Sequence, residues 1–112
     1  MTRDAWLVSN GTVLASAEHA TSHRDRGRGL LGRDSIEGAM VFDRTKWVHT
    51  MGMKFAIDVA HLDAEGVVIR LSHLPPNRVG VYVHKAVRVV EAQGGAFERW
   101  GLQLGDIVEI RE

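Results

Sequence analysis

The stretch WVHTMGMKFAIDVAHLD, residues 47–63, decides the fold because it contains the clearest strand signal in the chain. From Phe55 to Leu62 the side chains alternate between two faces that are both mainly apolar. One face carries Phe55, Ile57, Val59 and His61, and the other carries Ala56, Asp58, Ala60 and Leu62. A strand that is apolar on both sides is usually interior in its sheet, so we expect a central strand here.

Asp58 is the anomaly in this strand, since aspartate is depleted from strands. An ionised carboxylate that is buried without a partner is costly, and it takes up a proton unless it is paired. The sequence therefore predicts that Asp58 contacts a cation, a set of backbone amides or a ligand.

The segments before residue 47 predict a hairpin, a helix and a strand. Residues 5–8 and 13–17 read as an edge pair of short strands across an Asn-Gly turn. Ser22 and Asp25 resemble a capping box that opens a helix, and Gly32 is a stop signal for it. The arginines of this helix form a solvated face, or one of them, Arg28, reaches inward to pair with Asp58 or Glu91. Residues 38–42 follow as a strand.

The segments after residue 63 predict three more strands and a second short helix. Residues 67–71 return as the second arm of a hairpin, and residues 73–84 begin as an irregular loop because tandem prolines cannot donate to a ladder. Residues 86–92 form a strand with Val87, Val89 and Glu91 on one inward face. A helical turn at 96–100, ended by Gly101, and a strand at 107–110 complete the chain.

Composition indicates one ordinary globular domain over residues 1–112. The chain is 45% hydrophobic and 25% charged, and no apolar run approaches the ~20 residues that a membrane span requires. The first residues, MTRDAWLVSN, lack the features of a secretory signal, so we expect a cytoplasmic protein.

Charge and cysteine content exclude several classes of function. Fourteen basic and fourteen acidic residues cancel, so no general affinity for nucleic acid or anionic membranes is expected. The absence of cysteine excludes disulfides, thiolate zinc sites and cysteine nucleophiles. We predict no cofactor and no metal site.

Five segments in register resemble the domain of unknown function 192 family, and they span nearly the whole chain. They are GRGLLGRD at 27–34, GAMVF at 38–42, HTMGMKFAIDVAHLD at 49–63, VVEAQGG at 89–95 and GLQLGD at 101–106. The resemblance implies a small, mostly β, barrel-like bacterial or archaeal domain without an established activity. Together with the strand count it predicts an α+β, mostly β fold: a partly closed barrel of short, mainly antiparallel strands with two short helices.

The resemblance also implies which positions recur in the family. They fall on Gly29, Leu30, Arg33, Met51 or Met53, Asp58, Glu91, Gly95, Gly105 and Asp106. Many members have an aromatic-Met-Lys-Asn-Thr run followed by Pro-Leu-Asp, where this chain has His49-Thr50-Met51-Gly52-Met53 and Ala56-Ile57-Asp58. A function tied to the commoner version need not transfer.

Three kinds of site are consistent with these residues. In a strand, His49, Met51 and Met53 would project to one side as soft ligands that suit Cu(I), but no second His at metal spacing supports this, and methionines also fill cores. An enzyme would use His49 and Thr50 with Asp58 or Glu91 as acid, base or nucleophile. In the structural alternative, the two carboxylates pair with arginines or cap backbone amides.

The third kind of site belongs to a binding or accessory domain, which we favour over copper binding and catalysis. A pocket around the central strand, under the Pro75-Pro76 loop, would hold a small ligand or peptide. Its predicted lining is Arg28, His49, Thr50, Met51, Met53, Asp58 and Glu91. A protein partner would instead use the aromatic residues Trp47, Tyr82, Phe97 and Trp100 as anchors. An exposed aromatic cluster would favour a protein partner, and a closed polar pocket would favour a ligand.

Overall fold

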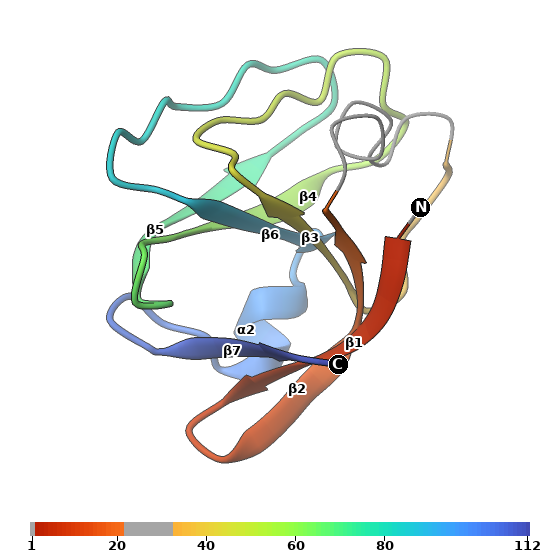
Figure 1. Cartoon of the computed structure of the whole chain (residues 1–112). Coiled ribbons are helices and arrows are strands. Elements are labelled where there is room, and N and C mark those ends of the chain that lie inside the picture. The colour runs from red at the N-terminus through yellow and green to blue at the C-terminus, as the bar shows by residue number, and fades with distance from the viewer. Residues whose placement is uncertain (1, 22–32) are drawn as a thin grey trace.

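The computed structural model describes residues 2–21 and 33–112, and within them the chain forms one curled sheet of seven strands (Figure 1). The strands are β1 (Thr2–Ser9), β2 (Thr12–Ala20), β3 (Ala39–Asp43), β4 (Ile57–Leu62), β5 (Val68–Leu74), β6 (Arg88–Gln93) and β7 (Val108–Arg111). One short helix, α2 (Ala96–Trp100), precedes β7. The predicted helix that opens at Ser22 lies outside the described residues.

The strand order β5-β4-β6-β3-β2-β1-β7 makes the sheet a partly closed barrel. Only β2 and β3 are parallel, and all other neighbours are antiparallel. The two edge strands meet at one corner, where Val67 and Ile107 form a bridge and the Val68 N–H donates to the Asp106 carbonyl at 2.8 Å. The predicted fold class is confirmed.

The hairpins follow from their turn residues. Asn10 and Gly11 both have positive φ, 52° and 75°, which is the geometry of the tight turns that suit the twist of antiparallel strands. The predicted hairpin, with arms at residues 55–62 and 67–71, is confirmed as β4 and β5. The expectation that the first hairpin is an edge was wrong, because the chain end returns as β7 and pairs with β1.

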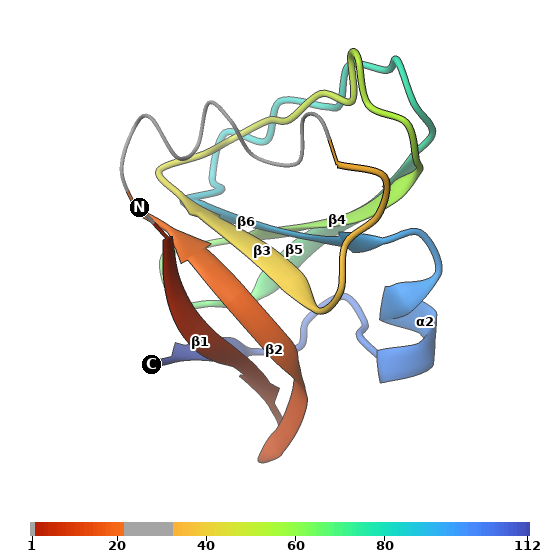
Figure 2. The same ribbon diagram turned by 90° about the vertical axis from the view of Figure 1, so that its right-hand side faces the viewer.

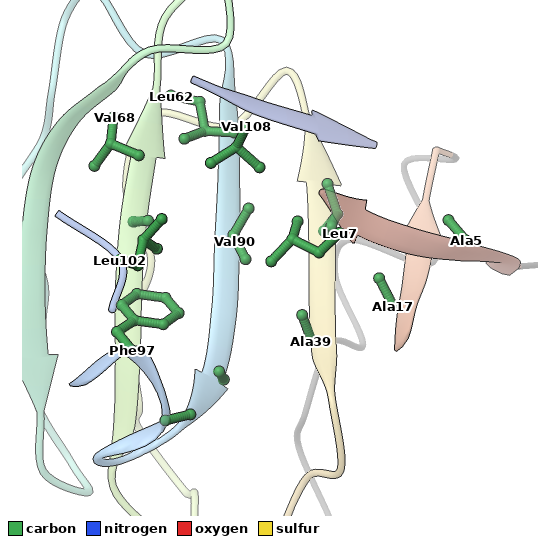
Figure 3. Packing of buried hydrophobic residues seen from close by; sticks show 14 residues of the cluster. Ala5, Leu7, Ala17, Ala39, Leu62, Val68, Val90, Phe97, Leu102 and Val108 are labelled. Atoms are coloured by element: carbon green, nitrogen blue, oxygen red, sulfur yellow. The ribbon is translucent and has the colours of Figure 1, made fainter. Parts of the chain in front are cut away.

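Two cores cover the two faces of the sheet. The first lies inside the barrel, where side chains of β1, β4, β6 and β7 meet Phe97 and Leu102 (Figure 3). The second lies on the other face and contains Met40, Phe42, Ile57, Val59 and Val89, with Ile36, Met53 and Phe55 packed over them from the connecting segments. The predicted alternation of the central strand is therefore confirmed, and it places consecutive residues of β4 in different cores.

The second half of the chain also matches its turn signals. Gly101 ends α2 with φ 70°, as predicted. In contrast, the strand predicted at 86–92 begins only at Arg88. Val87 is exposed rather than inward because the chain is still leaving the turn at His84–Lys85. No helix among the described residues is long and apolar enough to cross a membrane.

Candidate functional site

Two loops, residues 44–56 and 75–87, lie side by side over one end of the sheet (Figures 1 and 2). They pair as a short irregular ladder, which we call the loop ladder: residues 46–50 run antiparallel to residues 78–83. Its backbone bonds are Thr50 N–H to Arg78 O, Gly80 N–H to Val48 O, and Val83 N–H to Lys46 O, at 2.8, 2.8 and 2.9 Å. A Cβ on Gly80 would lie 2.7 Å from the Val48 carbonyl oxygen, so glycine allows this close approach.

The outer side of the loop ladder is apolar and exposed. His49 and Val79 are opposite each other, and the Trp47 and His49 rings lie 6.0 Å apart between centroids. Alternation along both segments adds Met51 and Val81 to this side. Trp47, Met51, Val79 and Val81 are 46%, 48%, 68% and 48% exposed. We call Trp47, His49, Met51, Val79 and Val81 the loop face; Tyr82, 59% exposed, adjoins it in the chain.

Thr50 points the other way and holds the two loops together. It is fully buried, and its hydroxyl donates to the Pro75 carbonyl at 2.5 Å and accepts from the Arg78 N–H at 2.9 Å. Its backbone carbonyl accepts from the Asn77 and Met53 N–H groups. A hydroxyl with these bonds is a structural clamp and not a free nucleophile.

The three predicted soft ligands do not share one side. His49 and Met51 are exposed, whereas Met53 is buried in the second core. The chain turns at Gly52, where φ is 78°, and the Met53 N–H donates to the Thr50 carbonyl, so the alternation ends there. No group of three or more His, Cys, Asp or Glu that could hold a metal occurs in residues 2–21 and 33–112.

Asp58 finds backbone amides, one of the three partner types predicted for it. Its Oδ2 accepts from the N–H groups of Gly95 and Phe97 at 2.9 and 3.1 Å, and its Oδ1 contacts His73 Nδ1 at 3.0 Å. Gly95 is the N-cap of α2 and has no side chain to cap the helix itself. Asp58 therefore supplies the missing cap from β4.

Glu91 faces the second core, on the opposite side of the sheet from Asp58. It lies between Val59 and Met40 in the sheet register, and no hydrogen bond to its carboxyl group is present among the described residues. Burial raises its pKa to about 8, so at neutral pH it is mostly protonated. His61, on the same side of β4 as Val59, is also buried, and burial together with nearby Arg70 lowers its pKa.

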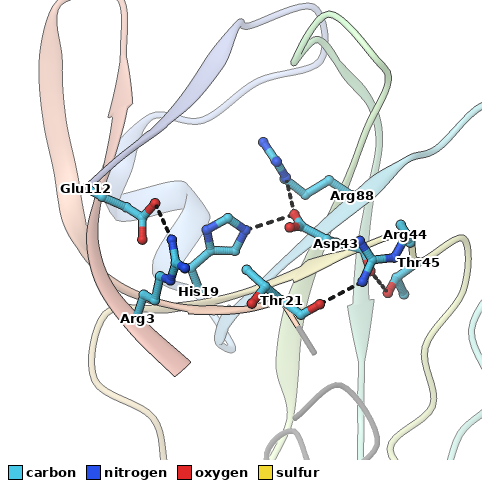
Figure 4. Close-up of polar contacts among 8 residues, drawn as sticks. All are labelled: Arg3, His19, Thr21, Asp43, Arg44, Thr45, Arg88 and Glu112. Carbon is cyan, nitrogen blue, oxygen red and sulfur yellow. Dashed lines mark hydrogen bonds and ion pairs between the residues drawn. The ribbon is translucent and has the colours of Figure 1, made fainter. Parts of the chain in front are cut away.

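A polar cluster that the sequence did not reveal ties three strand ends together (Figure 4). Asp43 at the end of β3 contacts His19 Nε2 at 2.8 Å and accepts from Arg88 Nε at 2.7 Å. Burial alone raises the pKa of Asp43, but the hydrogen bonds from His19 and Arg88 outweigh it and hold the pKa below its usual value. These residues are far apart in sequence, and no spacing marks them as a group.

The structure thus separates the predicted pocket residues. It brings His49 and Met51 together on the loop face, with Thr50 and Met53 turned inward and the two carboxylates on opposite faces of the sheet. Arg28 lies outside the described residues. A half-open depression of about 510 Å³ lies by β1 and β2, lined among others by Trp6, Glu18 and Arg33, and none of the six predicted residues that the structure describes lines it.

The aromatic residues also divide into two groups. Phe97 is buried and Trp100 packs against the first core, with their ring centroids 5.5 Å apart. Trp47 and Tyr82 are exposed, and so are available to a partner. Sequence analysis missed Val79 and Val81; the available signal was the alternation in RVGVYV, residues 78–83.

Comparison with known proteins supports the fold. The family model of DUF192, described as an uncharacterized ACR, matches residues 5–110. A crystal structure of a protein of unknown function from Novosphingobium aromaticivorans DSM 12444 has a TM-score of 0.79 and 18% identity, covering 96% of this chain and 84% of that chain. Another, of a "putative transcription regulator" from Sinorhizobium meliloti 1021, has a TM-score of 0.80 and 18% identity, covering 98% and 94%. No match was found among curated proteins.

Proposed function

The chain belongs to the DUF192 family, whose function is unknown, and we propose that this member is a binding domain that holds a peptide segment of a protein partner on its loop face. The observation that carries the proposal is the exposed apolar side of the loop ladder, made by Trp47, His49, Met51, Val79 and Val81. The two loops supply the side chains, and the barrel supplies a fixed platform.

The composition of the loop face suits a protein partner. Tryptophan, tyrosine and methionine are enriched at protein interfaces, where aromatic anchors contribute most of the binding free energy. Apolar side chains scattered singly on a surface need no explanation, but here two paired loops carry five exposed residues, of which His49 lies opposite Val79 and Trp47 contacts His49. The buried Thr50 clamp fixes both segments, so little conformational entropy is lost when a partner docks.

The polar residues of the central stretch are already hydrogen-bonded within the fold, and this favours binding at the loop face over a site at the central strand. Both carboxylate oxygens of Asp58 are already engaged: Oδ2 accepts from two backbone N–H groups, and Oδ1 contacts His73. A ligand would have to break these contacts to reach the carboxylate. Thr50 is likewise saturated. The loop face is the place where the predicted site residues His49 and Met51 remain accessible.

A display selection of random peptides against the folded protein tests the proposal. Binding of the enriched peptides is compared between the wild type and the double variant Met51→Ser/Val79→Ser, which removes apolar area and leaves the clamp intact. We expect at least a tenfold loss of affinity, about 1.4 kcal/mol. Leu104→Ser is the matched control, because Leu104 is 64% exposed on the turn before β7. Peptides that bind wild type and double variant equally would refute the proposal.

A further inference from the structure

The two loops that build the loop face are strongly polarised in charge. Residues 44–56 and 75–87 contain five of the fourteen basic residues, Arg44, Lys46, Lys54, Arg78 and Lys85, and none of the fourteen acidic ones. The rest of the chain therefore has nine basic and fourteen acidic residues. A protein with zero formal net charge thus carries an excess of cations in the two loops that hold the exposed apolar side chains of the loop face.

Most of these cations have no carboxylate partner among the described residues. Lys46 Nζ donates to the carbonyls of His84 and Ala86, and the Arg78 guanidinium donates to carbonyls of its own loop. Arg44 likewise donates to the Thr21 carbonyl, and only Lys54 pairs with an acid, Asp34 at 3.4 Å. Carbonyl contacts satisfy donors but leave the positive charge uncompensated.

This distribution of charge favours a partner with acidic residues over one with basic residues. In the chain, Lys46 and Lys54 flank the segment 47–51, and Arg78 and Lys85 flank the segment 79–82. A segment with acidic residues beside apolar anchors would gain attraction from both loops, and a basic segment would be repelled. We propose that the occupant of the loop face is an acidic peptide segment with apolar anchors. This inference rests on the proposed function.

A protein segment fits this surface better than the two other anionic classes. Single-stranded nucleic acid is held on successive aromatic faces on which bases stack. The two rings of the loop face, Trp47 and His49, contact each other, and its other members, Met51, Val79 and Val81, offer no ring. A membrane would bury the His49 ring, and this ring already accepts the Met51 N–H at 3.2 Å and can direct its other nitrogen to a peptide group. Aliphatic, aromatic and imidazole groups side by side are what a peptide can match.

The test uses the peptides whose binding depends on Met51 and Val79. Each is synthesised with its Asp and Glu residues changed to Asn and Gln, and affinities are measured at about 50 and about 500 mM salt. We expect the neutralised peptides to bind about tenfold more weakly than the acidic ones at low salt, and this difference should be smaller at high salt. The double variant Arg78→Gln/Lys85→Gln should lower the affinity for the acidic peptide by a similar factor. The control Arg70→Gln/Arg99→Gln should leave this affinity unchanged.

The outcomes separate the two proposals. If the neutralised peptides bind as well as the acidic ones and both still require Met51 and Val79, the loop face is a binding site but the acidic partner is wrong. If no peptide depends on Met51 and Val79, the binding function itself fails. Tighter binding of phosphatidylserine vesicles or poly(U) RNA through the same residues would also overturn the inference.

Discussion

At the residue scale, the carboxylate of Asp58 is the clearest case of a polar group with a structural task. Buried polar groups are expensive unless they are hydrogen-bonded, and Asp58 meets this demand with two backbone N–H donors at the start of α2. The same bonds satisfy amides that the first turn of a helix leaves without partners. The carboxylate thereby joins β4 to α2.

Asp58→Asn should lower the free energy of unfolding by about 1–3 kcal/mol, because the amide oxygen can still accept from Gly95 and Phe97 but loses the negative charge that strengthens both bonds. Urea unfolding measures the change. His73→Gln is the control, since His73 is largely exposed and its loss leaves both backbone bonds in place. A change below about 0.5 kcal/mol in Asp58→Asn would contradict the capping role.

Glu91 predicts a dependence of stability on pH. Its pKa in the fold, about 8, is above its ordinary value of 4.5, so the folded protein holds a proton that the unfolded chain releases. This contribution to stability is complete below about pH 4.5 and is lost as the pH rises to about 8. Between pH 6.5 and 8, where an unperturbed histidine goes from half neutral to almost fully neutral, the loss should be about 1.5 kcal/mol.

Glu91→Gln keeps the shape and removes the titration, so its stability should stay level over this range. Chemical unfolding at a series of pH values measures both curves, with Glu98→Gln as an exposed control that should follow the wild type. A wild-type curve that is flat between pH 6.5 and 8 would show that Glu91 is already ionised in the fold.

At the element scale, the loop ladder is an extension of the sheet without regular strands. Three backbone bonds and the Thr50 hydroxyl hold it, and Gly80 lets the two loops approach. Its inner side carries Thr50 and the half-buried Val48, which packs against the second core, and its outer side carries the exposed side chains of the loop face. The loops therefore serve both as a cover for the core and as the proposed binding surface.

Thr50→Val should loosen this element selectively. Valine has the same shape but leaves the Pro75 carbonyl and the Arg78 N–H without their partner, so we expect a loss of about 1–3 kcal/mol. Hydrogen exchange at the Arg78 and Gly80 amides should become faster while the amides of β4 and β6 stay protected. Thr45→Val, which loses one bond to Asp43, is the control. Uniformly faster exchange would mean that Thr50 supports the whole fold.

The elements also show what sequence can and cannot predict. Period-two alternation and turn residues predicted β4, its hairpin with β5, and α2, since these signals are local. The loop ladder pairs segments that are about thirty residues apart. Gly80 interrupts one segment and a turn at Gly52 ends the other, so no regular alternation in the sequence predicts this pairing. Trp47 and Phe97 are both large aromatic residues, and only the tertiary structure shows that one is exposed and the other is core.

At the scale of the whole molecule, charge is unevenly distributed between the two loops of the loop face and the rest of the chain. The two loops carry exposed apolar side chains and five basic residues, of which only Lys54 pairs with a carboxylate among the described residues, while the excess of acidic residues lies in the rest of the chain. A net charge of zero predicted no attraction to anionic partners, but the net charge hides the uneven distribution of basic and acidic residues. The distribution of charge, and not its sum, is what a partner meets.

The most direct test of the account is a nuclear magnetic resonance titration of the labelled protein with a peptide from the display selection. The account predicts that the shifted backbone amides lie in residues 46–51 and 78–83, and that these shifts are absent in Met51→Ser/Val79→Ser. Shifts centred instead on the depression beside β1 and β2, around Trp6 and Glu18, would contradict binding at the loop face.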